Sequence, residues 1–179
     1  LGTDYALIIS TNAGLWRYKI GDTIQFVSKY PFRIKVSGRT KHYMNAFGEE
    51  VIVDNAEQAL EHACNLTSSS IEDYTAAPIY LTQKEAGKHQ WLIEFRKQPN
   101  DLAQFTHYLD EKLKELNSDY EAKRKGNMAL ELPLVQPMTD KTFYNWMKKK
   151  NKLGSQNKVP RLCNTREHIE DILAMNQIV

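Results

Sequence analysis

The sequence predicts an α+β fold in which a short antiparallel β segment precedes a small mixed sheet with helices packed on it. Three observations support this class. The first 37 residues alternate β-forming runs with turn signals, apolar residues further along recur every three or four positions, and strand-like apolar runs lie between those helical stretches. The change of pattern near Gly38 divides the chain into residues 1–37, a hinge at 38–44 and an α/β domain at 45–179.

The first region is expected to contain β structure only. Short β-forming runs lie at Tyr5–Ser10, Thr23–Ser28 and Phe32–Ser37, and an extended pattern also resumes at 15–18. Gly21–Asp22 and other turn signals separate these runs. Tight turns between strands at this spacing predict an antiparallel meander or part of a small barrel.

In the second region, helical and extended patterns follow one another. Helices are predicted at 54–66, at 101–117, from 139 onward and at 167–175, and strands at 71–81, 90–97 and 130–136. The expected helix caps are Asp54, then Asn100 or Asp101, and then Thr139. Because prolines stand at 133 and 137, the last strand is placed at a sheet edge.

The composition is that of an ordinary globular protein. The 179 residues carry a formal net charge of +2, with 41% hydrophobic and 26% charged residues, which argues against a disordered chain or a coiled coil. So small a charge is no argument for nucleic acid, and no apolar run reaches the ~18 residues that a membrane span needs. The N-terminus also lacks the pattern of a secretory signal. We therefore expect a cytoplasmic protein without nucleic-acid or membrane partners, with Cys64 and Cys163 as reduced thiols and no metal site.

Common catalytic motifs are missing from the sequence. It contains no Walker, GxGxxG, HExxH or GxSxG pattern, so a nucleoside-triphosphate switch or a classical hydrolase is not supported. Gly21–Asp22 at the start of a strand could present a carboxylate to the two hydroxyls of a ribose, although it is also typical of a plain hairpin corner. Gly38–Lys41 suits either a solvated hinge between domains or an ordinary linker.

Two further features lie near the ends of the second region. Glu49 and Glu50 are adjacent and would point to opposite faces of an extended chain, so solvated acids beside a turn are favoured over a cooperating pair. Lys158 ends a Gly/Ser/Gln/Asn loop and is followed by Pro160. A lysine on a mobile loop can stabilise developing negative charge, and the simpler alternative is a surface lysine.

Taken together and in this order, these stretches resemble the auxin-responsive acyl-acid amido synthetases of the Gretchen Hagen family. The resemblance spans essentially the whole chain and is carried by Tyr5–Asp22, Gly38–Lys41, Asn45–Glu50 and Gln156–Arg161. That family belongs to the adenylate-forming superfamily, with acyl-CoA synthetases, peptide-synthetase adenylation domains and luciferase. The stretch from 38 to 50 is similar to bacterial rather than plant relatives. The resemblance implies a large N-terminal domain that holds the phosphate loop and the acyl pocket, with residues 1–37 as its β-rich tail.

The resemblance also implies roles for individual residues. Asp22 would bind the ribose hydroxyls of ATP, with Tyr18 and Arg39 at the nucleotide. Lys41 would be the hinge, and Lys158 would contact the carboxylate substrate and the phosphate during adenylation. ATP, with Mg²⁺ on its triphosphate, would be held mainly by the N-terminal domain.

The implied activity is that of an ATP-dependent ligase, which adenylates a carboxylic acid and conjugates it to an amine such as an amino acid. The C-terminal domain would rotate between the two half-reactions. The partners would be the protein's own N-terminal domain and the two substrates, and this chain alone would be inactive because it lacks the phosphate loop. Two alternatives stay open: an acyl-CoA-forming ligase, and a non-catalytic module that binds an anionic partner through Lys148–Lys150. A solvated helix end is the favoured interpretation of that lysine run.

Overall fold

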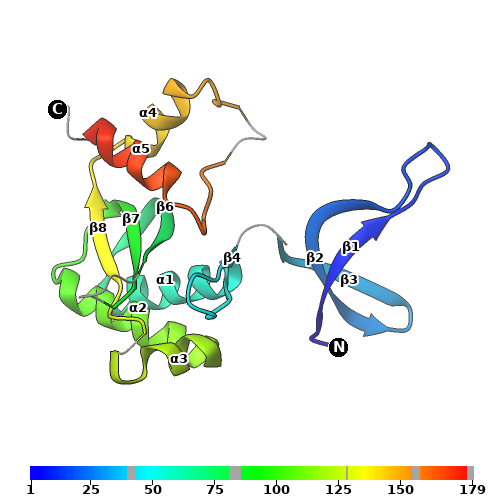
Figure 1. Ribbon diagram of the computed structural model, residues 1–179, viewed down its shortest axis with the longest axis horizontal. Helices are drawn as coiled ribbons and strands as arrows, with labels where there is room; N and C mark the ends of the chain where they lie inside the picture. Colours follow the sequence, from blue (N-terminus) through cyan, green and yellow to red (C-terminus); the bar gives the residue numbers. More distant parts are fainter. Residues whose placement is uncertain (40–42, 81–85, 128, 155–157, 177–179) are drawn as a thin grey trace.

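The computed structural model describes residues 1–39, 43–80, 86–127, 129–154 and 158–176. These residues form a three-stranded sheet near the N-terminus and a larger α/β body that contains a second three-stranded sheet (Figure 1). The α+β class predicted from the sequence is therefore confirmed. Within the described residues, no helix combines the length and the apolar character that crossing a bilayer requires.

The first sheet consists of β1 (Asp4–Ile9), β2 (Tyr18–Lys29) and β3 (Phe32–Arg39), all antiparallel and in the order β1-β2-β3. The prediction of antiparallel strands here is confirmed, but Gly21–Asp22 is not a hairpin corner. It lies inside the single long strand β2, where one residue of β1 faces three residues of β2. Gly21 has a φ of 93°, and glycine adopts this value without the steric cost that other residues meet. The turn signal marks a β-bulge instead of a chain reversal.

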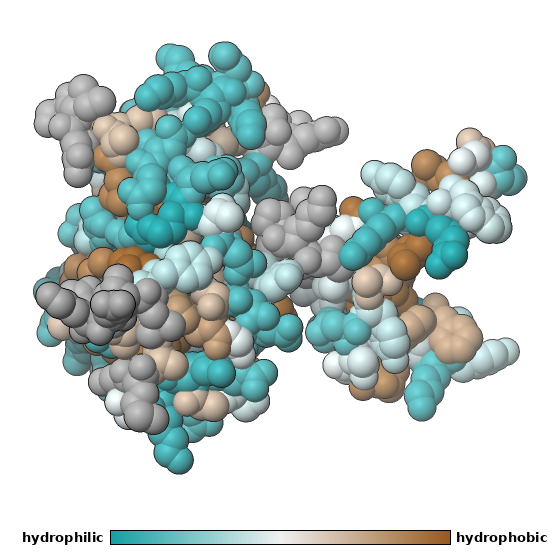
Figure 2. Space-filling view, in the orientation of Figure 1, coloured by the Kyte–Doolittle hydropathy of each residue, from teal (hydrophilic) through white to brown (hydrophobic). Residues whose placement is uncertain are grey.

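One face of the first sheet is apolar. The register places Tyr5, Ile24, Phe26, Phe32, Ile34 and Val36 on this face. Among its described side chains only Ile24 is a buried hydrophobic residue, whereas Phe32 is 78% exposed and Val36 is 68% exposed. Figure 2 shows apolar surface on this part of the molecule. Among the residues that the structure describes, no second layer covers the hydrophobic face of the first sheet.

The α/β body begins with a two-stranded ribbon and continues with a mixed sheet and its helices. Its elements, in chain order, are β4 (Tyr43–Met44), β5 (Val51–Ile52), α1 (Val53–Thr67), β6 (Ser70–Ile79), β7 (Lys88–Lys97), α2 (Leu102–Leu116), α3 (Ser118–Arg124), a 3-10 turn at Lys125–Asn127, β8 (Leu134–Met138), α4 (Thr142–Lys149) and α5 (Glu167–Asn176). β6 and β7 are antiparallel and β7 and β8 are parallel, in the order β6-β7-β8. The predicted edge position of the last strand is confirmed.

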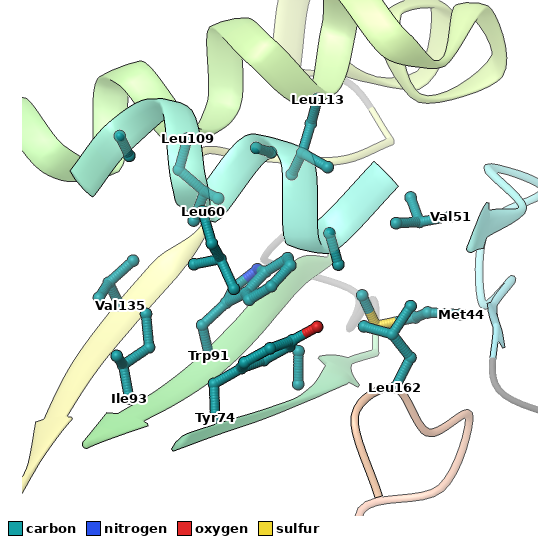
Figure 3. Packing of buried hydrophobic residues seen from close by; sticks show 14 of the residues in the cluster. Met44, Val51, Leu60, Tyr74, Trp91, Ile93, Leu109, Leu113, Val135 and Leu162 are labelled. Atoms are coloured by element: carbon teal, nitrogen blue, oxygen red, sulfur yellow. The ribbon is translucent and has the colours of Figure 1, made fainter. Parts of the chain in front are cut away.

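The sheet of the α/β body is covered on both faces. Trp91 and Ile93 of β7 belong to a hydrophobic cluster with Leu60 of α1 and Leu109 of α2 (Figure 3). Leu92, between them in the same strand, belongs to a second cluster that includes residues of α4 and α5. Successive side chains of a strand point to opposite faces, so these two clusters lie on the two sides of the sheet. The body is a three-layer structure with its own core.

The helix caps agree with the prediction at one position and differ at two. Asp101 caps α2, and its carboxylate accepts hydrogen bonds from the N–H groups of Ala103 (2.8 Å) and Gln104 (3.1 Å). Asp54 does not cap α1: Ile52 is the N-cap residue, and its N–H donates to Asn55 Oδ1 at 3.3 Å. Asp54 is the second residue of α1, because the helix begins at Val53, directly after β5 and without a loop.

Thr139 was predicted to cap α4, and this is also wrong. The N-cap residue is Lys141, in a left-handed conformation, and it supplies no side-chain bond. The buried carboxylate of Glu94 on β7 performs this task, accepting from the N–H groups of Lys141 (2.7 Å) and Phe143 (3.2 Å). The capping side chain belongs to β7, more than 40 residues earlier in the chain, so the sequence around the start of α4 does not indicate it. The short helix α3, with its own N-cap Asn117, was not predicted.

Candidate functional site

Lys158 is exposed and begins a segment, 158–164, that lies along β6. Thr75 Oγ1 donates to the Pro160 carbonyl at 2.6 Å. The Ala76 N–H donates to the Arg161 carbonyl at 2.9 Å, and the Cys163 N–H donates to the Ala76 carbonyl at 3.0 Å. These bonds are those of a short parallel bridge between Ala76 and Leu162. Lys158 therefore stands at the start of a fixed, strand-like segment.

The side chains of the 158–164 segment strengthen this anchoring. Val159 and Leu162 are buried. The Arg161 guanidinium forms an ion pair with Asp73, donates to the Tyr74 carbonyl at 3.2 Å, and lies 4.6 Å from the centre of the Tyr74 ring. Fixed neighbours on its C-terminal side limit how far the backbone of Lys158 can move.

A groove of about 1080 Å³ extends from Lys158 between the sheet and α4. Its apolar lining comes from Phe95, Phe143, Tyr144, Met147, Leu153 and Val159. Its charged lining comes from Glu72, Asp73, Glu94, Arg96, Asp140, Lys141, Lys152, Lys158 and Arg161. It is an apolar groove with a charged rim.

Most of the acidic groups of the groove are already compensated. Glu72 pairs with Arg96, Asp73 pairs with Arg161, and Glu94 accepts the N–H bonds at the start of α4. Among the described residues, no carboxylate lies within ion-pair distance of the ammonium groups of Lys141, Lys152 or Lys158. Three unpaired lysines and one remaining carboxylate, Asp140, favour a negatively charged ligand on this rim.

Three other predicted site residues lie on the first sheet. Tyr18 is half-exposed at the start of β2. Asp22 follows Gly21 in the bulge of the same strand, and its cross-strand partner in the ladder is Arg39. Bulges often re-aim a side chain beside a functional site. The fold thus brings Tyr18, Asp22 and Arg39 onto one sheet, while Lys158 belongs to the α/β body. Lys41, the predicted hinge, lies outside the described residues.

Glu49 is completely buried, which corrects the prediction that it is solvated. Its Oε1 lies 2.9 Å from Nε2 of His89, which is also completely buried. The carboxylate accepts from the N–H groups of Ala46 (3.1 Å) and Phe47 (2.6 Å) as well. Glu50 is exposed with a φ of 42°, so the adjacent acids do point apart as expected. The prediction failed for Glu49 because its partner His89 is 40 residues away in the chain.

The buried Glu49 fixes the loop that leads out of β4. Burial by itself raises the pKa of the Glu49 carboxyl, but hydrogen bonds from His89 and from the Phe47 amide outweigh it, and the pKa lies below its ordinary value. The Phe47 ring stacks on His89 with 6.3 Å between centroids. A side chain at Gly87 would lie 2.3 Å from Phe47 Cζ, so glycine is required there by close approach. The Asn117 side chain also holds this loop, because its Nδ2 donates to the Glu49 carbonyl at 2.8 Å.

The lysine run of α4 and the two cysteines form no site of their own among the described residues. Lys150, in the basic run at the end of α4, pairs with Asp171 at 2.6 Å, and Lys148 and Lys149 lie in the last helical turn, as the helix-end interpretation predicts. Cys64 and Cys163 are free thiols, and burial raises the pKa of each. The described residues contain no group of three or more His, Cys, Asp or Glu side chains that could hold a metal ion.

Comparison with known protein families gives two matches in the order of the chain. Residues 1–39 match the GH3 family central domain, and residues 54–167 match the GH3 family C-terminal domain. The second match alone covers more than half of the 179 residues. No curated protein sequence matches the chain significantly.

Solved structures support the same fold. A structure titled "GH3.15 acyl acid amido synthetase" matches with a TM-score of 0.78 and 21% identity, over 97% of this chain and 33% of that one. A second, titled "AtGH3.15 acyl acid amido synthetase in complex with 2,4-DB", matches with a TM-score of 0.73 and 20% identity, over the same shares of the two chains. At this identity the likeness shows the fold alone. The chain spans about a third of the length of these structures.

Proposed function

The chain belongs to the GH3 family, and from this premise we propose that it is part of a ligase that joins a carboxylic acid to an amine at the expense of ATP. In the first half-reaction, the acid's carboxylate attacks the α-phosphate of ATP, which gives an acyl-adenylate and releases pyrophosphate. In the second, the amine of an acceptor such as an amino acid attacks the acyl carbon and displaces AMP.

The observation that carries this proposal is the position of Lys158. It is exposed at the start of an anchored segment, on a rim where its ammonium has no carboxylate partner among the described residues. Adenylation brings a carboxylate against a phosphate, and a positioned ammonium lowers the cost of joining two anions. An unpaired lysine on a fixed base suits this task, because it does not have to leave another partner first.

The remaining site residues receive their roles by the same proposal. Asp22 would accept hydrogen bonds from the ribose hydroxyls of ATP, with Tyr18 and Arg39 beside it on the first sheet. Lys41 would be the hinge about which the α/β body rotates between the half-reactions. Mg²⁺ would be bound by the phosphates of ATP.

The first partner would be the protein's own N-terminal domain. The apolar face of the first sheet needs a covering layer, and the match of residues 1–39 is to a central domain that precedes the C-terminal domain. We expect this N-terminal domain to supply the phosphate loop and the acyl pocket. The isolated chain should therefore give no ATP–pyrophosphate exchange. The two free cysteines agree with a protein that works in the reducing cytoplasm.

The test is ATP–pyrophosphate exchange by the full-length protein with a panel of carboxylic acids that includes 2,4-DB. We expect exchange that depends on the acid and falls at least about a hundredfold in Lys158→Ala. Lys97→Ala removes an exposed lysine of the same α/β body that does not line the groove, and it is the matched control, with an expected change below about twofold.

A second measurement separates the half-reactions. Transfer from a preformed acyl-adenylate to the amine should change little in Lys158→Ala, because the ammonium acts where the two anions meet. Equal losses in both steps would contradict the role of Lys158. No exchange with any acid, from a folded protein that binds ATP, would contradict the ligase itself.

A further inference from the structure

Asn164 joins two parts of the α/β body that are far apart in the sequence. Its side-chain Oδ1 accepts a hydrogen bond from the Asn45 N–H at 2.7 Å, and its Nδ2 donates to the Tyr43 carbonyl at 3.2 Å. Tyr43 begins β4, the first strand after the predicted hinge residue Lys41, and Asn45 directly follows this strand. One side-chain amide thus bonds an acceptor and a donor of the same short backbone stretch, much as a neighbouring strand would.

The same residue is tied to the segment that begins at Lys158. It follows Cys163, whose N–H bonds to the Ala76 carbonyl of β6. The Asn164 carbonyl accepts from the Tyr80 hydroxyl at 2.6 Å, and the Tyr80 ring lies 6.1 Å from that of Phe47 in the loop after β4. Asn164 is therefore bonded to the backbone of Tyr43 and Asn45 and to the side chain of Tyr80, which directly follows β6. Through the Tyr80 ring it is also linked to the loop that contains Phe47.

Apolar packing reinforces this connection. Met44, between the two residues that Asn164 holds, and Leu162, two residues before Asn164, are both completely or almost completely buried in one hydrophobic cluster. Both lie at the same end of that cluster in Figure 3. Within the described part of the chain, the strand partner of β4 is the two-residue strand β5. A ribbon of two such short strands is only weakly stable by itself. Asn164 adds two hydrogen bonds to the backbone of this ribbon, as a third strand would.

We propose that Asn164 is a positioning residue that fixes β4, the first strand after the predicted hinge residue Lys41, to the segment that begins at Lys158. It would make β4 and this segment move as one unit, so that rotation at the hinge carries Lys158 through a defined path. The functional part of this inference rests on the proposed role of Lys158. The structural part, the coupling of β4 to the 158–164 segment, does not.

Amide hydrogen exchange on this chain tests the coupling directly. In Asn164→Ala, exchange at the Asn45 amide should rise by about tenfold, and exchange at Cys163 should rise with it, while the amides of α2 keep their rates. Asn164→Asp retains an acceptor for the Asn45 N–H but loses the donor to Tyr43, so Asn45 should stay closer to wild type. Asn145→Ala, on the exposed side of α4, is the matched control and should change nothing.

An Asn45 amide that keeps its protection in Asn164→Ala would overturn the proposal. If the α2 amides also exchange faster, the variant has lost stability throughout, and Asn164→Asp decides. Protection at Asn45 that is retained in Asn164→Asp supports the bond, and protection that is lost equally in both variants contradicts it.

A double-mutant cycle in the full-length protein tests the functional part. Asn164→Ala should lower the rate of ATP–pyrophosphate exchange by about tenfold when Lys158 is present, and by less than about twofold in the Lys158→Ala background. Equal factors in both backgrounds would show that Asn164 does not act through Lys158, and would overturn the proposal. If Lys158→Ala itself has no effect on exchange, the proposed role of Lys158 is contradicted, and the hydrogen-exchange experiment still tests the coupling of β4 to the 158–164 segment by itself.

Discussion

The two sheets of the molecule contain similar kinds of apolar residues but bury them very differently. The α/β body has helices on both faces of its sheet, and Trp91 at the centre is 0% exposed. The first sheet has an apolar face of comparable character, yet Phe32 on it is 78% exposed. A sheet with one hydrophobic face gains stability when that face is buried against a second layer. The comparison shows that the α/β body contains two buried hydrophobic clusters, whereas the apolar face of the first sheet is largely exposed among the described residues.

The largest expected effect comes from breaking the core of the body. Trp91→Ala should lower the free energy of unfolding of this chain by about 3–5 kcal/mol, because it removes a fully buried aromatic ring and leaves a cavity. The matched truncation in the first sheet, Phe32→Ala, should cost less than about 1 kcal/mol. Denaturant unfolding followed by far-ultraviolet circular dichroism, which reports the helices of the body, measures both. Equal losses would refute the contrast between the two regions.

A smaller effect is expected at the buried Glu49–His89 pair. Glu49→Gln should cost about 2–3 kcal/mol near neutral pH, because an amide cannot accept all the hydrogen bonds that the carboxylate accepts. The pKa of Glu49 is lowered in the folded state, so its contribution is complete above the ordinary value of 4.5 and is lost as the pH falls through the folded pKa.

The stability difference between wild type and Glu49→Gln should therefore narrow as the solution becomes acidic. Denaturant titrations at several pH values between neutral and strongly acidic would show this. Glu50→Gln changes the exposed neighbour and should follow the wild type at every pH. A difference that stays constant with pH would mean that the carboxylate charge contributes nothing to this site.

The pattern of these residues explains how much the sequence could predict. Helices α1 and α2 each bury a stripe of residues spaced by three and four, and such a stripe is visible in any single sequence. The burial of Glu49, the capping of α4 by Glu94 and the link from Asn164 to β4 all join residues that are 40 or more positions apart. Such pairings arise from tertiary packing, and no local spacing encodes them.

The site residues show the same limit. The anchored position of Lys158 depends on Thr75 and Ala76 of β6, more than 80 positions earlier in the chain. The sequence singled out Lys158 as the end of a loop, which is a local property. Gly21–Asp22 was similarly recognised as an irregularity, but a bulge and a corner have the same local signature, and only the pairing with β1 distinguishes them.

A third prediction sharpens the contrast by restoring the covering layer. Val36→Ser on the apolar face of β3 should change the stability of this chain by less than about 0.5 kcal/mol, because the side chain is already 68% exposed. In the full-length protein the same change should cost about 2 kcal/mol, since the valine would then be buried against the N-terminal domain. Thermal unfolding of the two proteins with and without the substitution measures this. Equal effects in both would show that no layer covers this face.

The smallest expected effect on stability is at Lys158. Its side chain is exposed and has no ion-pair partner among the described residues, so Lys158→Ala should alter the free energy of unfolding by less than about 0.5 kcal/mol in this chain. Denaturant unfolding of the variant beside the wild type measures it, and a loss of more than 1 kcal/mol would show that the lysine is part of the structure. A residue whose removal leaves the fold intact but abolishes adenylation contributes to substrate binding or to the reaction and not to stability. The anchoring contacts of residues 159–164 would then serve to hold in place a lysine that contributes no stability of its own.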